Sequence, residues 1–87
     1  MTIQELANQL RDYKKEINHK STLKVYNLLE NNKKVFLQKM EADSFTMLLK
    51  NFENLANENP KEYTSESYKR EHEKSFELLL FYLDKII

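Results

Sequence analysis

The sequence predicts an all-α fold, a small four-helix up-and-down bundle, and three observations support this fold class. The 87 residues include no glycine and one proline, where average usage would give about six glycines and four prolines. Tight β-hairpin turns depend on such residues. Apolar residues recur at intervals of three and four along most of the chain, which is the period of an amphipathic helix. Ser, Thr, Asp or Asn precedes each apolar stripe, as expected at helix N-caps.

Length and composition predict a single domain, residues 1–87, and exclude several classes of function. A chain this short buries only about 60 to 65% of its unfolded surface. It has no cysteine, which excludes a disulfide, a thiolate nucleophile and a Cys-type zinc site. Tight helix packing or oligomerisation must therefore supply its stability. The lack of glycine also argues against phosphate-binding loops of the Rossmann and P-loop types.

The start of the chain and its apolar runs predict a cytoplasmic protein without a membrane span. Residues 1–5 lack the basic and apolar regions of a signal peptide. The longest uninterrupted apolar run has only six residues, 78–83. Twelve lysines against two arginines, with nine asparagines, indicate an AT-rich coding sequence. We therefore expect the protein to come from a low-GC bacterium or one of its phages.

The first predicted helix spans residues 2–18. Thr2 and Glu5 form a capping box, in which each side chain satisfies an unpaired backbone N–H at the helix start. We expect Asn18 to end the helix, because Asn tolerates the left-handed conformation of a C-cap. The apolar stripe consists of Ile3, Leu6, Leu10, Tyr13 and Ile17.

The second predicted helix spans residues 22–41, with Ser21 or Thr22 as its N-cap. Asn31 and Asn32 mark the place where this helix is expected to kink or break, since Asn is unfavourable inside a helix. Three consecutive apolar residues at 35–37 cover more of the helix circumference than one partner helix would bury. This helix is therefore expected to be central or shared with another chain.

The third predicted helix spans residues 44–57, with Asp43 or Ser44 as its N-cap. No glycine or proline marks its start, but the apolar stripe slips in phase at residues 42–44, which favours a change of direction there. The alternative is a three-helix fold in which the second and third helices are fused. Pro60 ends the third helix, because the residue before a proline is driven out of the α region.

The fourth predicted helix spans residues 65–87, with Thr64 or Ser65 as its N-cap. Its segment 78–83 is apolar on every side, and such a segment is expected to be buried all round. Either the last helix packs centrally in a monomer, or part of its apolar surface contacts another protein or a second copy. The predicted partner-binding residues are Val35, Tyr68, His72, Leu78, Phe81, Tyr82, Ile86 and Ile87.

Histidine chemistry and nucleophilic catalysis find little support in the sequence. His19 forms a Glu-x-x-His pair with Glu16, but a second such pair at His72 would need a glutamate where the chain has Lys69. We interpret His19 as a solvated loop residue and His72 as a partly buried seam residue, or else a pH-sensitive interface contact. No serine lies in a nucleophile elbow. We therefore predict no catalytic residue, no cofactor, no metal ligand and no enzyme activity.

One stretch of the chain is basic although the formal net charge is zero. Its local charge of +3 would suit an acidic protein or a phosphate backbone. The alternative is an ordinary solvated helix face, and a neutral chain argues against nucleic acid as the main partner. The basic residues are Arg11, Lys14, Lys15, Lys20 and Lys24.

By elimination, the sequence favours a non-enzymatic module that binds another protein through apolar helix surface, in a regulatory or inhibitory role. In size and charged helical composition the chain resembles bacteriocin immunity proteins and small phage-encoded inhibitors. This resemblance implies a function of that type and assigns no residue. The first alternative is an architectural homodimer, and the second is a nucleic-acid-binding regulator that uses the basic stretch 11–24.

Overall fold

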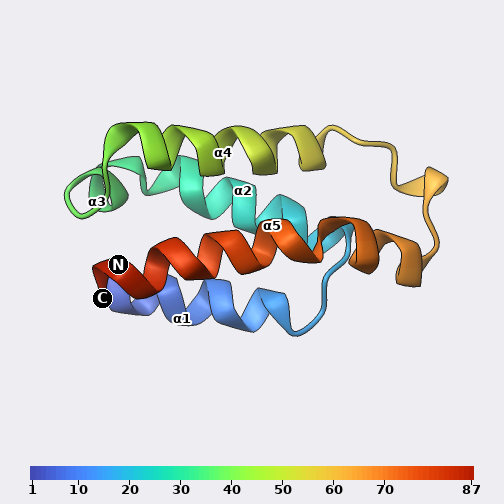
Figure 1. The fold of residues 1–87 in the computed structure, drawn as a ribbon, viewed down its shortest axis with the longest axis horizontal. Coiled ribbons are helices and arrows are strands. Elements are labelled where there is room, and N and C mark those ends of the chain that lie inside the picture. Colours follow the sequence, from blue (N-terminus) through green and yellow to red (C-terminus); the bar gives the residue numbers. More distant parts are fainter.

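The computed structural model describes all 87 residues and consists mainly of helices (Figure 1). The chain is 80% helical and contains no strand, which confirms the predicted all-α helical bundle. No helix combines the length and the apolar character that crossing a membrane requires. The elements are α1 (Ile3–Lys14), α2 (His19–Asn31), α3 (Lys33–Leu37), α4 (Ala42–Ala56), the 3-10 helix η1 (Pro60–Glu62) and α5 (Ser65–Ile86).

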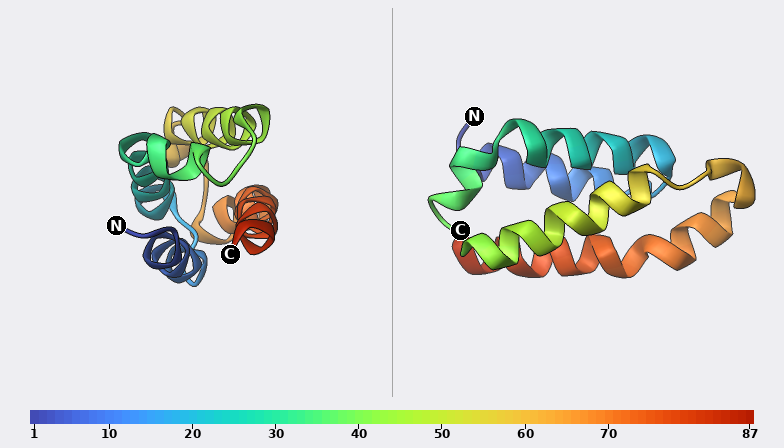
Figure 2. Two further views of the ribbon diagram at one scale, coloured as in Figure 1. Left: turned by 90° about the vertical axis from the view of Figure 1, so that its left-hand side faces the viewer. Right: turned by 90° about the horizontal axis from the view of Figure 1, so that it is seen from above.

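The four long helices, α1, α2, α4 and α5, form an antiparallel bundle. Seen end-on in Figure 2, they lie at the corners of a square in that order, and each contacts the two beside it. Helix α5 therefore closes the bundle by packing against both α1 and α4. Both chain termini lie at one end of the bundle, and η1 lies at the other (Figure 1).

The core is one cluster of seventeen buried apolar residues, to which all four long helices and α3 contribute. Phe52 of α4 and Phe76 of α5 meet edge to face with their ring centroids 5.2 Å apart. Phe36 of α3 stacks on Phe45 of α4 at 5.6 Å. These two pairs connect α5 and α3 to α4.

The first turn differs from the prediction. Helix α1 ends at Lys14, and Asn18 is the N-cap of α2 with an extended backbone (φ −150°) instead of a left-handed C-cap. Asn18 Oδ1 accepts a hydrogen bond from the Ser21 N–H at 2.9 Å, and Ser21 Oγ accepts one from the Asn18 N–H at 3.0 Å. The expectation that Ser21 or Thr22 caps α2 is wrong, because Ser21 completes the box from inside the helix and Thr22 is buried.

The predicted second helix, 22–41, is in fact two helices. Helix α2 begins at His19 and ends at Asn31, and α3 follows after Asn32. The Asn32 Nδ2 donates a hydrogen bond to the Leu28 carbonyl oxygen at 2.9 Å. The side chain of Asn32 thus bonds to the last turn of α2, and the predicted break at this point is confirmed.

The chain reverses direction between α3 and α4, so the fused three-helix alternative is wrong (Figure 1). Helix α4 begins at Ala42, and its N-cap is Glu41, which makes no side-chain capping bond. The expectation that Asp43 or Ser44 caps this helix is wrong, because both residues lie inside its first turn. Asp43 still suits that position, since a negative charge is favourable near a helix N-terminus.

The predicted starts of the first and last helices are confirmed. Thr2 and Glu5 form the expected capping box at α1. Thr64 caps α5 and forms a capping box with Ser67. The other differences are small: α4 spans Ala42–Ala56 instead of 44–57, and α5 ends at Ile86 instead of residue 87.

Asn18→Ala is expected to destabilise the protein by about 1 kcal/mol, since α2 would lose its N-cap. Asn27→Ala, on the exposed face of the same helix, removes no side-chain hydrogen bond and should stay within about 0.5 kcal/mol of wild type. Chemical denaturation followed by circular dichroism measures both values. Equal stability of the two variants would contradict the role of Asn18.

Candidate functional site

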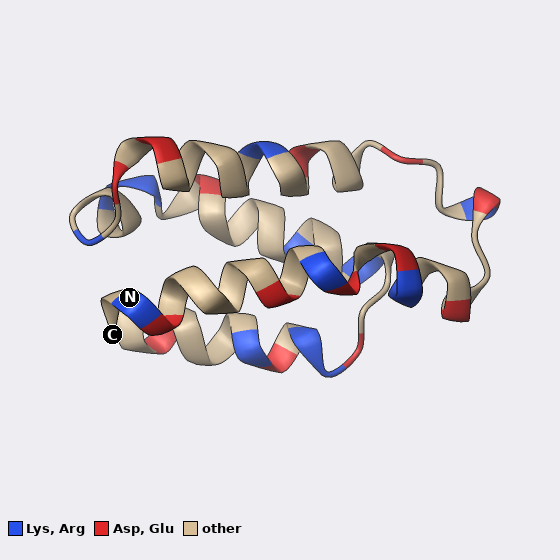
Figure 3. Cartoon of the chain, in the orientation of Figure 1, with Lys and Arg blue, Asp and Glu red and all other residues tan.

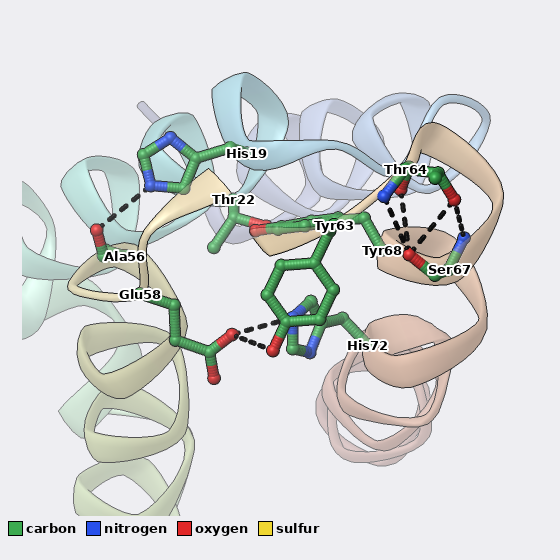
Figure 4. Close-up of polar contacts among 9 residues, drawn as sticks. All are labelled: His19, Thr22, Ala56, Glu58, Tyr63, Thr64, Ser67, Tyr68 and His72. Carbon is green, nitrogen blue, oxygen red and sulfur yellow. Dashed lines mark hydrogen bonds and ion pairs between the residues drawn. The ribbon is translucent and has the colours of Figure 1, made fainter. Parts of the chain in front are cut away.

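A group of polar and aromatic side chains lies where α2, the end of α4, η1 and the start of α5 come together (Figure 4). We call its members, Thr22, Glu58, Tyr63, Tyr68 and His72, the Glu58 cluster. Glu58 Oε2 accepts a hydrogen bond from the Tyr63 hydroxyl at 2.8 Å. The same oxygen lies 3.0 Å from His72 Nε2, although the two atoms are not aligned as a hydrogen bond. This contact becomes an ion pair when the imidazole is protonated.

The local sequence explains how Tyr63 returns to Glu58. Pro60 is the first residue of η1, and Asn59 Oδ1 accepts a hydrogen bond from the Lys61 N–H at 3.1 Å. Helix α4 has already ended at Ala56, and these features start a single 3-10 turn. The turn carries Tyr63 back over the end of α4, where its hydroxyl reaches the carboxylate.

Aromatic rings enclose the rest of the Glu58 cluster. The Tyr68 hydroxyl donates a buried hydrogen bond to Thr22 Oγ1 at 2.9 Å. The Tyr68 ring packs edge to face on His72 and Tyr63, with centroid distances of 4.4 and 5.4 Å. Only 5% of His72 is exposed, so the imidazole offers little access to a substrate. The cluster is arranged to hold η1 and α5 against α2 and α4.

The environment raises the pKa of both tyrosine hydroxyls in the cluster. For Tyr63 the main cause is the hydrogen bond to Glu58, followed by burial and by nearby carboxylates, and all of these raise the pKa. Burial raises the pKa of Tyr68, and its hydrogen bond to Thr22 offsets part of the effect. Both hydroxyls therefore stay protonated at neutral pH and act as hydrogen-bond donors.

The two histidines lie in different surroundings. His72 is a buried seam residue, which confirms the interpretation made from the sequence. His19 is not a solvated loop residue, because α2 begins earlier than expected and includes it. Its Nε2 lies 3.1 Å from the Ala56 carbonyl oxygen at the end of α4. The side chain of His19 therefore links α2 to α4.

The structure divides the predicted partner-binding residues by accessibility. Tyr68 and His72 are only 3% and 5% exposed, which corrects their assignment to a partner surface, because both point into the Glu58 cluster. Phe81 and Ile87 are exposed by 54% and 49%. The remaining four are half-buried: Val35, Leu78, Tyr82 and Ile86.

One apolar surface forms on the last three turns of α5. We call Leu78, Phe81, Tyr82 and Ile86 the α5 patch. Leu78, Phe81 and Lys85 share one outward face, because side chains three and four residues apart lie together on a helix. The Phe81 and Tyr82 rings meet edge to face at 5.7 Å, and Lys85 Nζ lies 4.3 Å from the Phe81 ring centroid.

The expectation that segment 78–83 is buried all round is wrong. Leu79 and Leu83 are fully buried, whereas more than half of Phe81 is exposed. In a four-helix bundle each helix has neighbours on only part of its circumference. The segment therefore fills the core with one face and presents apolar surface with the other.

An open hollow of about 290 Å³ adjoins the α5 patch. Met40, Tyr82 and Ile86 line it with apolar surface, and Lys39 and Lys85 contribute exposed cations. The sequence pattern did not reveal Lys39 and Met40, because only the tertiary fold brings them beside the end of α5. Lys85 could have been found, since it lies four residues after Phe81.

The predicted basic stretch does not form one surface. Arg11, Lys14 and Lys15 line a hollow against α5, and Arg11 pairs with Asp84 at 2.8 Å. Lys20 and Lys24 line a separate hollow that also includes residues of α1. Acidic residues lie in both: Glu73 in the first, and Asp12 and Glu16 in the second. Figure 3 shows the same mixture, with basic and acidic residues interleaved along α1 and α5.

Comparisons with known protein families, with curated proteins and with solved structures find no match to this chain. No group of three or more His, Cys, Asp or Glu residues is arranged to hold a metal ion. Function is therefore inferred from the geometry of the Glu58 cluster, the α5 patch and the hollow beside it.

Glu58→Ala is expected to destabilise the protein by about 1 to 3 kcal/mol, because the Tyr63 hydroxyl and the buried His72 nitrogen both lose their acidic partner. Glu62→Ala, in the same connection, removes an exposed carboxylate that makes no hydrogen bond or ion pair. That control should stay within about 0.5 kcal/mol of wild type. Thermal and chemical denaturation compare them, and a loss of similar size in both variants would argue against the cluster as a structural link.

Tyr68→Phe is expected to change how stability depends on alkaline pH. The pKa of Tyr68 is raised in the folded protein above its ordinary value of 10.0. The contribution of the Tyr68 hydroxyl to the stability of the fold is therefore complete below pH 10. That contribution is lost as the pH rises, because the unfolded chain then releases the proton more readily than the folded one. Denaturation midpoints from pH 8 to about 11 should show the stability advantage of wild type over Tyr68→Phe shrinking. A stability difference between wild type and Tyr68→Phe that stays constant across this pH range would refute the prediction.

Proposed function

We propose that this protein is a non-enzymatic binding module that docks on another protein through the α5 patch, in a regulatory or inhibitory role. The observation that carries the proposal is the 54% exposure of Phe81 next to three half-buried apolar side chains of the same helix, Leu78, Tyr82 and Ile86. Isolated exposed apolar residues are common on proteins. A group of aromatic and aliphatic side chains beside a hollow is more informative, because aromatic residues are enriched at protein interfaces.

Phe81 is not part of the core, although the other three residues of the α5 patch are half-buried and pack against it. Phe36, Phe52 and Phe76 are fully buried, and the core cluster already draws on every long helix. Full burial of a large apolar side chain stabilises by about 1.5 to 3 kcal/mol, and because 54% of Phe81 is exposed, about half of that gain remains available to a partner. The enclosed imidazole of His72 also favours binding over catalysis, because no substrate reaches it easily.

A photo-crosslinking residue placed at position 81 is expected to capture one partner protein in the cell of origin. The control carries the same residue at Met47, an exposed apolar position on α4. The captured protein, once purified, should bind Phe81→Ser at least about tenfold more weakly than wild type, a loss of about 1.4 kcal/mol. Met47→Ser should bind like wild type.

Three outcomes would oppose this proposal. Equal labelling from positions 81 and 47 would indicate random encounters. No labelling from position 81 would show that the α5 patch is not a docking surface. Capture of a second copy of the chain, with a dimer mass in light scattering, would favour the architectural homodimer instead.

A further inference from the structure

Two cations beside the α5 patch have no acidic partner within the protein. Neither Lys39 nor Lys85 takes part in any ion pair of the structure. Lys85 Nζ lies instead over the rings of Phe81 and Tyr82, at 4.3 and 5.7 Å from their centroids. This position keeps the ammonium group at the border between the apolar surface and water.

The carboxylates nearby do not neutralise this region. Glu41 is the one acidic residue that lines the hollow, and it pairs with neither lysine. Asp84, next to Lys85 in sequence, is bound to Arg11 at 2.8 Å. The hollow therefore combines an apolar lining with a net positive charge.

We propose that the hollow and the α5 patch receive an acidic segment of the partner protein, a peptide in which an apolar side chain is flanked by carboxylates. The apolar side chain would enter between Met40, Tyr82 and Ile86, and the carboxylates would pair with Lys39 and Lys85. This inference rests on the proposed function and names the chemistry of the partner. Its basis is charge complementarity, which fixes the register of an interface and excludes wrong partners.

A second copy of this chain fits the surface less well. A twofold dimer places the same patch on both sides of the interface, so the net positive hollow of one protomer would lie in the same interface as that of the other. Charges of the same sign across an interface oppose association. The charge of this surface thus favours a different, acidic protein.

An anionic membrane surface also fits less well. Recognition of anionic lipid typically uses about four to eight clustered basic residues, and this surface offers two. Its apolar part is a hollow suited to one or two side chains, whereas a helix that lies on a membrane presents a broad apolar face.

The test selects binders from a library of random linear peptides displayed on phage, with the whole protein immobilised. The selected peptides should carry an apolar residue flanked by Asp or Glu. Their affinity, measured by fluorescence anisotropy, should fall at least about tenfold for the double variant Lys39→Glu, Lys85→Glu. The matched control, Lys69→Glu with Lys74→Glu, makes the same change in net charge at exposed positions elsewhere on α5 and should bind like wild type. Circular dichroism checks that both variants remain folded.

Several results would overturn the inference. These are selection of no peptide, peptides without acidic residues, or an equal loss of affinity in the two double variants. Binding to vesicles of phosphatidylserine and phosphatidylcholine without binding to the acidic peptides would assign the surface to a membrane. If crosslinking at position 81 captures a partner whose labelled segment is not acidic, the inference fails while the proposed function stands. If crosslinking captures no protein while acidic peptides still bind at Lys39 and Lys85, the proposed function fails and the preference of this surface for acidic peptides stands.

Discussion

Helix α5 closes the bundle through one buried stripe, and the Glu58 cluster and the α5 patch both depend on this packing. Phe76, Leu79 and Leu83 are fully buried in a helix that contacts both α1 and α4. Burial of each such side chain stabilises by about 1.5 to 3 kcal/mol. The net free energy of unfolding of a typical domain is only about 5 to 15 kcal/mol. Once this stripe is fixed, helical geometry turns Phe81 and Lys85 outward.

The turns of the bundle work without glycine because no residue adopts a positive φ. Asparagine side chains bond to backbone groups at Asn18, Asn32 and Asn59. The sequence predicted the break at Asn32 correctly, because two adjacent asparagines interrupt an apolar helix there. It misplaced the role of Asn18, since asparagine suits either end of a helix. The extended backbone of Asn18 and its reciprocal hydrogen bonds with Ser21 distinguish the two roles.

The candidate site was predicted in part, and the errors have a common origin. Tyr68 and His72 lie four residues apart on the same stripe as Phe76, so the helical period already placed them on the core side. Their partners could not be identified from the sequence, and a polar side chain is rarely buried without one. The partners come from other elements: Thr22 is 46 residues away from Tyr68 in the sequence, and Glu58 precedes α5. No local pattern reveals such contacts.

The two ends of α5 use polar groups in opposite ways, and this difference bears on specificity. At the Glu58 cluster, the hydroxyls of Tyr63 and Tyr68 find acceptors inside the protein, so burying them costs little. In the hollow beside the α5 patch, Lys39 and Lys85 are exposed and form no ion pair. An uncharged partner that covered the apolar lining would strip water from both ammonium groups without replacing it, which is costly for a buried charge. The same two lysines that would attract the proposed acidic segment would therefore reject an uncharged or basic one.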